Sequence, residues 1–307
     1  MKFLTLWKMA IVLTPLIFIG GYLMLAEKDK NDELDKNRDI AERIKNNPDV
    51  ITHRTLNIDS GYSLHYVYSP YSVANNLNKT EQKTSVVFVH GTPGSWGTFS
   101  RYFEDKSLIK NVQLYSIDRP GWGESGYLGN SFPVNLSDQS SLIEPILEEI
   151  WKANNQEKII VVGHSLGGSL VPKLAVDYPN YIKGVIILAG DLDPELSEAR
   201  WFNTLLDWVP SLLLPDMWRN SNNEVIAIRP SLERLQGEFA TISMPITVLQ
   251  GTDDTLVRPG SAEKAPAIFE SSDVEVIYLK GASHIINHTH PQDVKNAIYS
   301  MIEKTQS

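Results

Sequence analysis

Short runs of apolar, mostly β-branched residues recur along this chain and constrain its fold more than any other feature. Such runs are typical of strands that are buried on both faces of a parallel sheet. They span residues 85–89, 112–117, 158–162, 185–188, 246–249 and 274–279. Stretches long enough for helices lie between several of them, over residues 136–153, 166–178, 261–269 and 291–302.

Two further strand-like segments precede these runs. Residues 51–58 and 62–68 are joined at Asp59-Ser60-Gly61, which is typical of a hairpin. An antiparallel start followed by alternating strands and helices predicts an α/β fold, with a mostly parallel sheet covered by helices on both faces. We assign residues 50–190 and 244–307 to this core.

The segment between the last strands breaks the alternation. Residues 191–243 contain no buried-strand run and instead carry many large apolar side chains at helical spacing. We predict a helical cap here, and the alternative is additional packing against the core. Trp201 and Trp208 in this segment, together with Trp96 of the core, are predicted to contact substrate.

The N-terminal segment differs from the rest of the chain. Residues 9–26 carry no charge, and eighteen residues in a helix span about 27 Å, close to the ~30 Å hydrocarbon core of a bilayer. We predict that residues 1–26 form an uncleaved transmembrane anchor. A cleaved signal peptide is the first alternative, although Met24 is bulky where a small residue is needed. A buried core helix is the second.

Charges around this segment predict the location of the domain. Lys2 and Lys8 precede the apolar run, which favours a cytoplasmic N-terminus and a catalytic domain outside the cytoplasm. Cleavage would instead give a secreted protein. Residues 27–49 are mostly charged, and we expect a solvated tether or an exposed helix there.

Composition excludes several classes of function. The chain has no cysteine, which excludes a cysteine nucleophile and thiolate metal sites. A formal charge of −9 opposes nucleic-acid binding. Three histidines near the C-terminus, at 284, 288 and 290, lack neighbouring carboxylates or cysteines, so we predict neither a metal nor a cofactor.

The sequence Gly163-His164-Ser165-Leu166-Gly167 carries the strongest chemical signal. It follows the apolar run at 158–162 directly and precedes a helix-length stretch. This is the context of a nucleophile elbow, where small flanking residues let a sharp strand-to-helix turn form and expose the serine. We therefore predict that Ser165 is a nucleophile.

A serine nucleophile needs a base and an acid nearby. His284 follows the last predicted strand, and the carboxyl ends of parallel strands converge at one edge of a sheet, so we predict His284 as the base. Asp254 follows the run at 246–249 and is our predicted acid, preferred over Asp253. Asp191 or Asp193, after the preceding strand, are the remaining candidates.

An oxyanion hole is the last requirement. His90-Gly91-Thr92-Pro93-Gly94 follows the first apolar run, and its glycines allow a close backbone approach. We predict that the N–H groups of Thr92 and Leu166 form the hole. Residues 118–125 (DRPGWGES) are expected to support the site structurally.

Together these motifs resemble the α/β-hydrolase fold superfamily, in its branch with HGxPG, DRPGxGxS, GHSxGG and GxxD motifs. The resemblance covers about residues 52–305 and implies a Ser-Asp-His order along the chain. Relatives with aspartate at the elbow are haloalkane dehalogenases and epoxide hydrolases, and Ser165 argues against both. Many relatives carry Glu-Pro shortly after the catalytic histidine, whereas this chain has His290-Pro291.

The sequence therefore predicts a serine hydrolase that acts through an acyl-enzyme on a carboxylic ester of a small or medium apolar acid. Alternatives within enzymes are amide or peptide cleavage, as in proline iminopeptidase-like relatives, and hydrolysis of a carbon–carbon bond. A catalytically inactive binding protein on the same fold is the alternative from another class. The predicted partners are a small-molecule substrate and, through the N-terminus, a membrane.

Overall fold

A single sheet forms the centre of the molecule in the computed structural model, which describes residues 28–58, 61–70, 83–127 and 132–306. Its strand order among the described residues is β1-β2-β4-β3-β5-β6-β7-β8. The strands are β1 (Thr52–Asn57), β2 (Ser63–Tyr68), β3 (Thr84–Val89), β4 (Val112–Ile117), β5 (Ile159–His164), β6 (Ile182–Leu188), β7 (Ile246–Gly251) and β8 (Val274–Leu279). Strand β2 runs antiparallel to β1 and β4, and all other pairs are parallel. The predicted α/β fold with an antiparallel start is confirmed.

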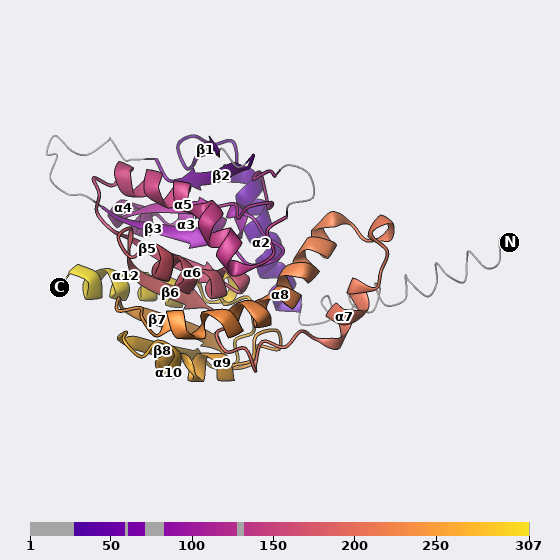
Figure 1. Ribbon diagram of the computed structural model, residues 1–307. Helices are drawn as coiled ribbons and strands as arrows, with labels where there is room; N and C mark the ends of the chain where they lie inside the picture. Colours follow the sequence, from indigo (N-terminus) through magenta and orange to yellow (C-terminus); the bar gives the residue numbers. More distant parts are fainter. Residues whose placement is uncertain (1–27, 59–60, 71–82, 128–131, 307) are drawn as a thin grey trace, which may run out of the picture.

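Helices cover both faces of the sheet (Figure 1). One face packs on α5 (Leu136–Ala153), α6 (Leu166–Asp177), part of α8 (Asp216–Phe239), α9 (Gly260–Glu263) and α10 (Ala265–Ile268). The other packs on α2 (Lys28–Ile44), η2 (Trp96–Phe99), α3 (Ser100–Phe103), α4 (Lys106–Asn111), α11 (Ile286–Thr289) and α12 (Pro291–Gln306). Each face buries a continuous apolar cluster, and burial of one large aliphatic side chain contributes about 1.5–3 kcal/mol.

Helix α2 occupies most of the segment 27–49, for which we expected a solvated tether or an exposed helix, and one of its sides is buried. Its outer face is exposed, but Ile40 and Ile44 enter the apolar cluster on one face of the sheet. The Asn37 side chain donates a hydrogen bond to the Gly97 carbonyl at 2.8 Å, and the Asn37 carbonyl accepts one from Ser100 Oγ at 2.9 Å. Residues three and four apart share one side of a helix. Asn37, Ile40 and Ile44 therefore form one buried side of a helix whose other residues are mostly charged.

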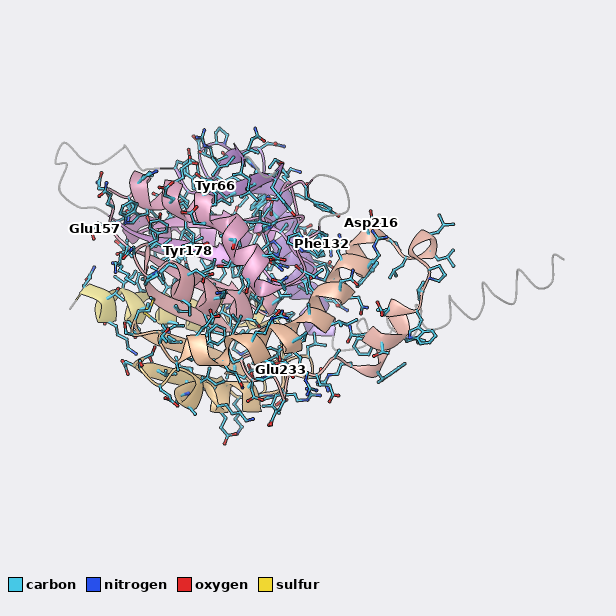
Figure 2. The ribbon with its side chains drawn as sticks, in the orientation of Figure 1. Tyr66, Phe132, Glu157, Tyr178, Asp216 and Glu233 are labelled. Atoms are coloured by element: carbon cyan, nitrogen blue, oxygen red, sulfur yellow. The ribbon has the colours of Figure 1, made fainter. Side chains whose placement is uncertain are left out.

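The segment 191–243 divides between cap and core. It contains α7 (Trp201–Asp207), η3 (Ser211–Leu213) and α8. Helix α7 and the first half of α8 project beyond the sheet (Figure 1). Figure 2 shows Asp216, the first residue of α8, on this projecting side and Glu157 at the opposite end of the molecule. In the second half of α8, Leu232, Leu235 and Phe239 are buried in the core, so this half of the helix belongs to the core packing. We call the projecting part, from α7 to the first half of α8, the cap.

The predicted anchor lies outside the described residues. Within the part of the chain that the structure describes, no helix combines the length and the apolar character that a membrane span requires. Attachment of the domain to a membrane stays a prediction.

Candidate active site

Ser165 occupies a strained turn between β5 and α6. Its backbone has φ 55° and ψ −122°, a conformation that costs a non-glycine residue about 1–3 kcal/mol. A Cβ on Gly163 would lie 2.1 Å from the Gly167 carbonyl oxygen, and one on Gly167 would lie 2.2 Å from the Val89 carbonyl oxygen. Only glycines fit at these two flanking positions, so the sequence around Ser165 is dictated by the sharpness of the turn.

His284 and Asp254 come together in the loops that follow β8 and β7. His284 Nδ1 lies 2.9 Å from Asp254 Oδ2. The other carboxylate oxygen, Oδ1, accepts hydrogen bonds at 2.9 Å from the backbone N–H groups of Leu256 and Val257. Burial acts to raise the pKa of Asp254, but His284 and these N–H groups outweigh it and hold the pKa below its usual range. The carboxylate is therefore ionised and fixed in orientation beside the imidazole.

The alternative acids lie in different surroundings. Asp253 is exposed and its carboxylate accepts a hydrogen bond from Thr252 Oγ1 at 2.9 Å. Asp193 pairs with Lys264 at 2.8 Å. Asp191 accepts a hydrogen bond from Ser197 Oγ at 3.1 Å, and burial, with a smaller contribution from Asp254, raises its pKa to about 6. Among these aspartates, the structure brings Asp254 into hydrogen-bond contact with His284.

His164 links the elbow to the loop that carries His284. Its Nε2 lies 2.9 Å from the His284 carbonyl oxygen, which can only accept, so Nε2 carries the proton. The two imidazole rings lie with centroids 4.9 Å apart. Burial lowers the pKa of His164 to about 3, and the neighbouring His284 acts in the same direction, so the ring is neutral at neutral pH.

Ser165 and His284 therefore lie at the same edge of the sheet. No hydrogen bond joins Ser165 Oγ to His284 in the described part of the chain. Hydrogen bonds between a catalytic nucleophile and its base are often long before substrate binds and shorten in the complex.

The loop that follows β3 lies directly against Ser165. A Cβ on Gly91 would lie 2.7 Å from Ser165 Cβ and 3.3 Å from its Oγ, so the glycine permits the approach. Thr92 is the next residue in this loop. Leu166 begins α6, and the first N–H groups of a helix have no partner within it. The backbone of residues 91–92 and the N-terminus of α6 thus flank the serine.

A buried arginine holds this loop in place and connects it to the cap. Arg119 Nε and Nη2 donate hydrogen bonds to the carbonyl oxygens of His90 and Gly91 at 2.9 and 2.8 Å. Arg119 Nη1 lies 2.6 Å from Glu224 Oε1 on α8, and neither side chain is exposed. Gln139 and Trp122 also donate to Glu224, at 3.0 and 3.1 Å. From the sequence, Glu224 is a candidate cap carboxylate for a peptide substrate, whereas in the structure it is the buried partner of Arg119.

Two cavities lie near the cap. The larger, ≈ 760 Å³, is bounded by the loop after β3, the 121–127 loop and the start of α8, with α2 forming one wall. Pro93 and Gly94 line it, and these residues follow directly after the 91–92 segment that flanks Ser165. The smaller, ≈ 410 Å³, lies within the cap and is lined in part by Leu206, Trp208 and Leu214.

The three tryptophans predicted to contact substrate lie in different environments. Trp96 is buried in the core, with its ring edge-on to His53, and it lines neither cavity. Trp96 is the first residue of η2 and packs in the apolar cluster on that face of the sheet, and its contact with substrate stays a prediction. Trp201 and Trp208 are 74% and 82% exposed on the cap, and Trp208 lines the smaller cavity.

Comparison with known proteins decides the family. The sequence profile of the Alpha/beta hydrolase family matches residues 86–297. The chain belongs to the Alpha/beta hydrolase family. This match includes the elbow, Asp254 and His284.

Individual relatives of this chain have varied names. A probable 1-acylglycerol-3-phosphate O-acyltransferase of Oryza sativa subsp. japonica is 27% identical over 147 residues, which is 47% of this chain and 35% of that protein. The match thus spans about a third of the acyltransferase's length. Epoxide hydrolase 3 of Mus musculus is 21% identical over 289 residues, or 80% of this chain and 75% of that protein. A crystal structure of a putative lipase from Acinetobacter baumannii AYE has a TM-score of 0.61 at 18% identity, covering 87% of this chain and 95% of that one.

Proposed function

We propose that this hydrolase cleaves carboxylic esters of small or medium apolar acids through an acyl-enzyme on Ser165. One observation carries the proposal: an ionised carboxylate orients His284 at the sheet edge where the strained turn presents Ser165. A serine becomes nucleophilic when a base accepts its proton, and a carboxylate keeps the base in the required tautomer.

The chemistry proceeds in two halves. His284 Nε2 takes the Ser165 proton as Oγ attacks the carbonyl carbon, and the same proton passes to the leaving alcohol when the ester bond breaks. Water then loses a proton to His284 and attacks the acyl carbon. His284 returns that proton to Ser165 Oγ as the bond between Oγ and the acyl carbon breaks, and the acyl group leaves as the free acid. In both halves the N–H groups of Leu166 and Thr92 stabilise the developing oxyanion.

The elbow residue separates this proposal from epoxide hydrolysis. Relatives that open epoxides carry aspartate at the elbow, whereas this chain has Ser165. A serine there supports acyl transfer instead of alkyl-enzyme formation.

The cap supports an apolar acyl group. Trp201, Trp208, Leu212 and Leu213 expose large apolar surfaces on it. A peptidase that recognises a free amine would need an available cap carboxylate. Glu224 pairs with Arg119, Glu195 lies 3.4 Å from Lys264 and Glu198 lies 3.9 Å from Arg229, whereas Asp207 is exposed and lines the smaller cavity. Asp207 is therefore the cap carboxylate on which the peptidase alternative depends, and the substrate panel below separates that alternative from ester hydrolysis.

A substrate panel tests the proposal. The full chain in detergent would be assayed with p-nitrophenyl esters of increasing acyl length, a prolyl arylamide and a diketone. We expect turnover of the esters that Ser165→Ala abolishes. Arylamide or diketone hydrolysis without ester hydrolysis would overturn the proposal.

The same assay distinguishes the acyl acceptor, because several matched relatives are named acyltransferases. Added glycerol or a lysophospholipid would compete with water for the acyl group. We expect free acid as the main product, and an acylated acceptor as the main product would assign a transferase.

A further inference from the structure

A second group of titratable side chains lies outside the active site, where β1 and β2 meet the loop after β4. His53 lies on β1 and His65 on β2, and Thr55 is the residue directly opposite His65. Side chains two residues apart on a strand share a face, so the two histidines are diagonal neighbours on one side of the sheet. Glu124 reaches them from the loop that follows β4.

The outer nitrogen of each ring has an acceptor as its partner. His65 Nδ1 lies 2.7 Å from Asp118 Oδ2, and this carboxylate also accepts the backbone N–H groups of Trp96 and Glu124. His53 Nε2 lies 2.8 Å from the carbonyl oxygen of Lys45, which can only accept. Both of these nitrogens must therefore carry the proton of a neutral imidazole.

The inner nitrogens then face each other without a proton. His53 Nδ1 and His65 Nε2 lie only 2.9 Å apart. Two neutral rings in these tautomers would point lone pairs at one another, which is repulsive unless a cation lies between them. Glu124 Oε2 is 3.7 Å from His65 Nε2, and the three potential ligand atoms all lie within 4.8 Å of one another.

We propose that His53, His65 and Glu124 bind one divalent transition-metal ion, with Zn²⁺ as the ion of this class that best fits two imidazoles and a carboxylate. With Zn²⁺–N distances of about 2.0–2.1 Å, tetrahedral coordination places the two ligating nitrogens roughly 3.3–3.4 Å apart. Binding therefore requires the two rings to separate slightly from 2.9 Å and the half-exposed Glu124 side chain to move inward. A water completes a tetrahedral set.

The surroundings of His65 are those of a metal-binding histidine. A carboxylate on the opposite ring nitrogen fixes the tautomer and raises the basicity of the ligating nitrogen. Trp96 lies edge-on to the His53 ring, with centroids 5.8 Å apart, and restrains its rotation. A bound ion would join the edge strand β1 to β2 and to the 118–126 loop.

Zinc titration of the full chain tests the proposal. The protein would carry a tag without histidines, be freed of metal by a chelator, and be titrated with Zn²⁺ by calorimetry, with Co²⁺ absorption to report four-coordinate binding. We expect one Zn²⁺ per chain. His53→Gln removes an exposed ligand and should weaken binding by about 100-fold or more, as expected when the loss of even an outer-sphere partner costs 10–100-fold.

Two further variants make the outcome decisive. Glu124→Gln should also weaken Zn²⁺ binding, even if His53→Gln perturbs the hairpin, while His290→Gln, a histidine outside the group, should leave binding unchanged. Zn²⁺ binding that is equal in wild type and both ligand variants would overturn the proposal. Absence of any Zn²⁺ uptake would overturn it too, and would assign a shared proton to the histidine pair.

Discussion

Two carboxylate–histidine pairs in this molecule have the same internal geometry and different third partners. His284 and Asp254 lie 2.9 Å apart, and His65 and Asp118 lie 2.7 Å apart. Each aspartate also accepts two backbone N–H groups, so both carboxylates are held in orientation. The first pair stands at the edge that presents Ser165, whereas the second faces His53 and Glu124.

The comparison shows that a carboxylate–histidine pair does not define a function. The pair supplies an imidazole of fixed tautomer, and the third group decides whether that nitrogen moves a proton or binds a cation. Near Ser165, a strained turn and a helix N-terminus are the features on which the proposed acyl transfer depends. Near His53, a second ring nitrogen and a half-exposed carboxylate are the ligands of the proposed metal ion.

The largest effect is expected from replacing Ser165, the residue that the His284–Asp254 pair serves in the proposed reaction. Ser165→Ala should lower kcat by about six orders of magnitude if Ser165, His284 and Asp254 act as a unit. Ester hydrolysis under saturating substrate measures this. Ser169→Ala is the matched control, because Ser169 Oγ is buried without a hydrogen-bond partner among the described residues, and it should retain activity. Substantial turnover by Ser165→Ala would remove the distinction between the two pairs.

The next effect tests the carboxylate of the first pair. Asp254→Asn keeps an oxygen for the N–H groups of Leu256 and Val257 but favours the wrong His284 tautomer, so kcat should fall by about 10⁴. Asp253→Asn, at the exposed neighbouring position, should stay near wild type. Equal losses in both variants would show that Asp254 does not orient the base.

A buried carboxylate paired with arginine should behave differently from both histidine pairs. Arg119→Met leaves Glu224 buried without its cation, and the free energy of unfolding should fall by about 3–5 kcal/mol in urea denaturation. Arg119→Met with Glu224→Leu should recover much of that loss. Arg43→Met breaks an exposed pair with Glu104 and should change the free energy of unfolding far less than Arg119→Met does. A small loss for Arg119→Met would contradict a role in joining cap and core.

His288 extends the comparison to a buried histidine whose hydrogen-bond partner is the Asn287 amide and not a carboxylate. Burial, assisted by Arg101 and opposed by Glu33, lowers the pKa of His288 from 6.5 to about 4. In the unfolded chain His288 binds a proton below about pH 6.5, whereas in the folded chain it does so only below about pH 4. The free energy of unfolding therefore falls as the pH is lowered from 6.5 to 4. His288→Leu should lose less stability than wild type between pH 7 and pH 4, by up to about 3 kcal/mol. Unfolding measured at pH 7 and pH 4 tests this, and identical losses would contradict it.

The smallest effect tests the carboxylate of the second pair. Asp118→Asn should favour the other tautomer of His65 and weaken Zn²⁺ binding by about 10–100-fold. Calorimetry with the metal-free full chain measures it, and Asp105→Asn, an aspartate that pairs with Lys295, is the control. Unchanged Zn²⁺ affinity in Asp118→Asn would show that the two pairs are not chemically equivalent.

Periodicity and local motifs predicted the sheet well. The strands at 112–117 and 274–279 and the helix at 136–153 match the structure, because apolar patterning over one element is a local property. The elbow was equally visible, since the flanking glycines are required by the turn itself. Asp254 and His284 could be predicted because both follow strands that end at the same edge of the sheet.

Long-range pairing of polar groups was not visible in the sequence. Glu224 lies on a cap helix but pairs with Arg119, which is 105 positions earlier in the chain. His53 and His65 become neighbours only through the β1–β2 register. The buried side of α2 could not be predicted, because two isoleucines do not give an apolar pattern to a segment dominated by charged residues.

Labelling with a fluorophosphonate tests the central claim most directly, because the reagent reports an activated serine without any assumption about substrate. Intact-mass and peptide analysis of the full chain should show one adduct, on Ser165. Asp253→Asn should label at the wild-type rate, and His284→Gln should label far more slowly. An adduct on another residue, or equal labelling of His284→Gln and wild type, would contradict the assignment of Ser165 and His284 to one catalytic unit.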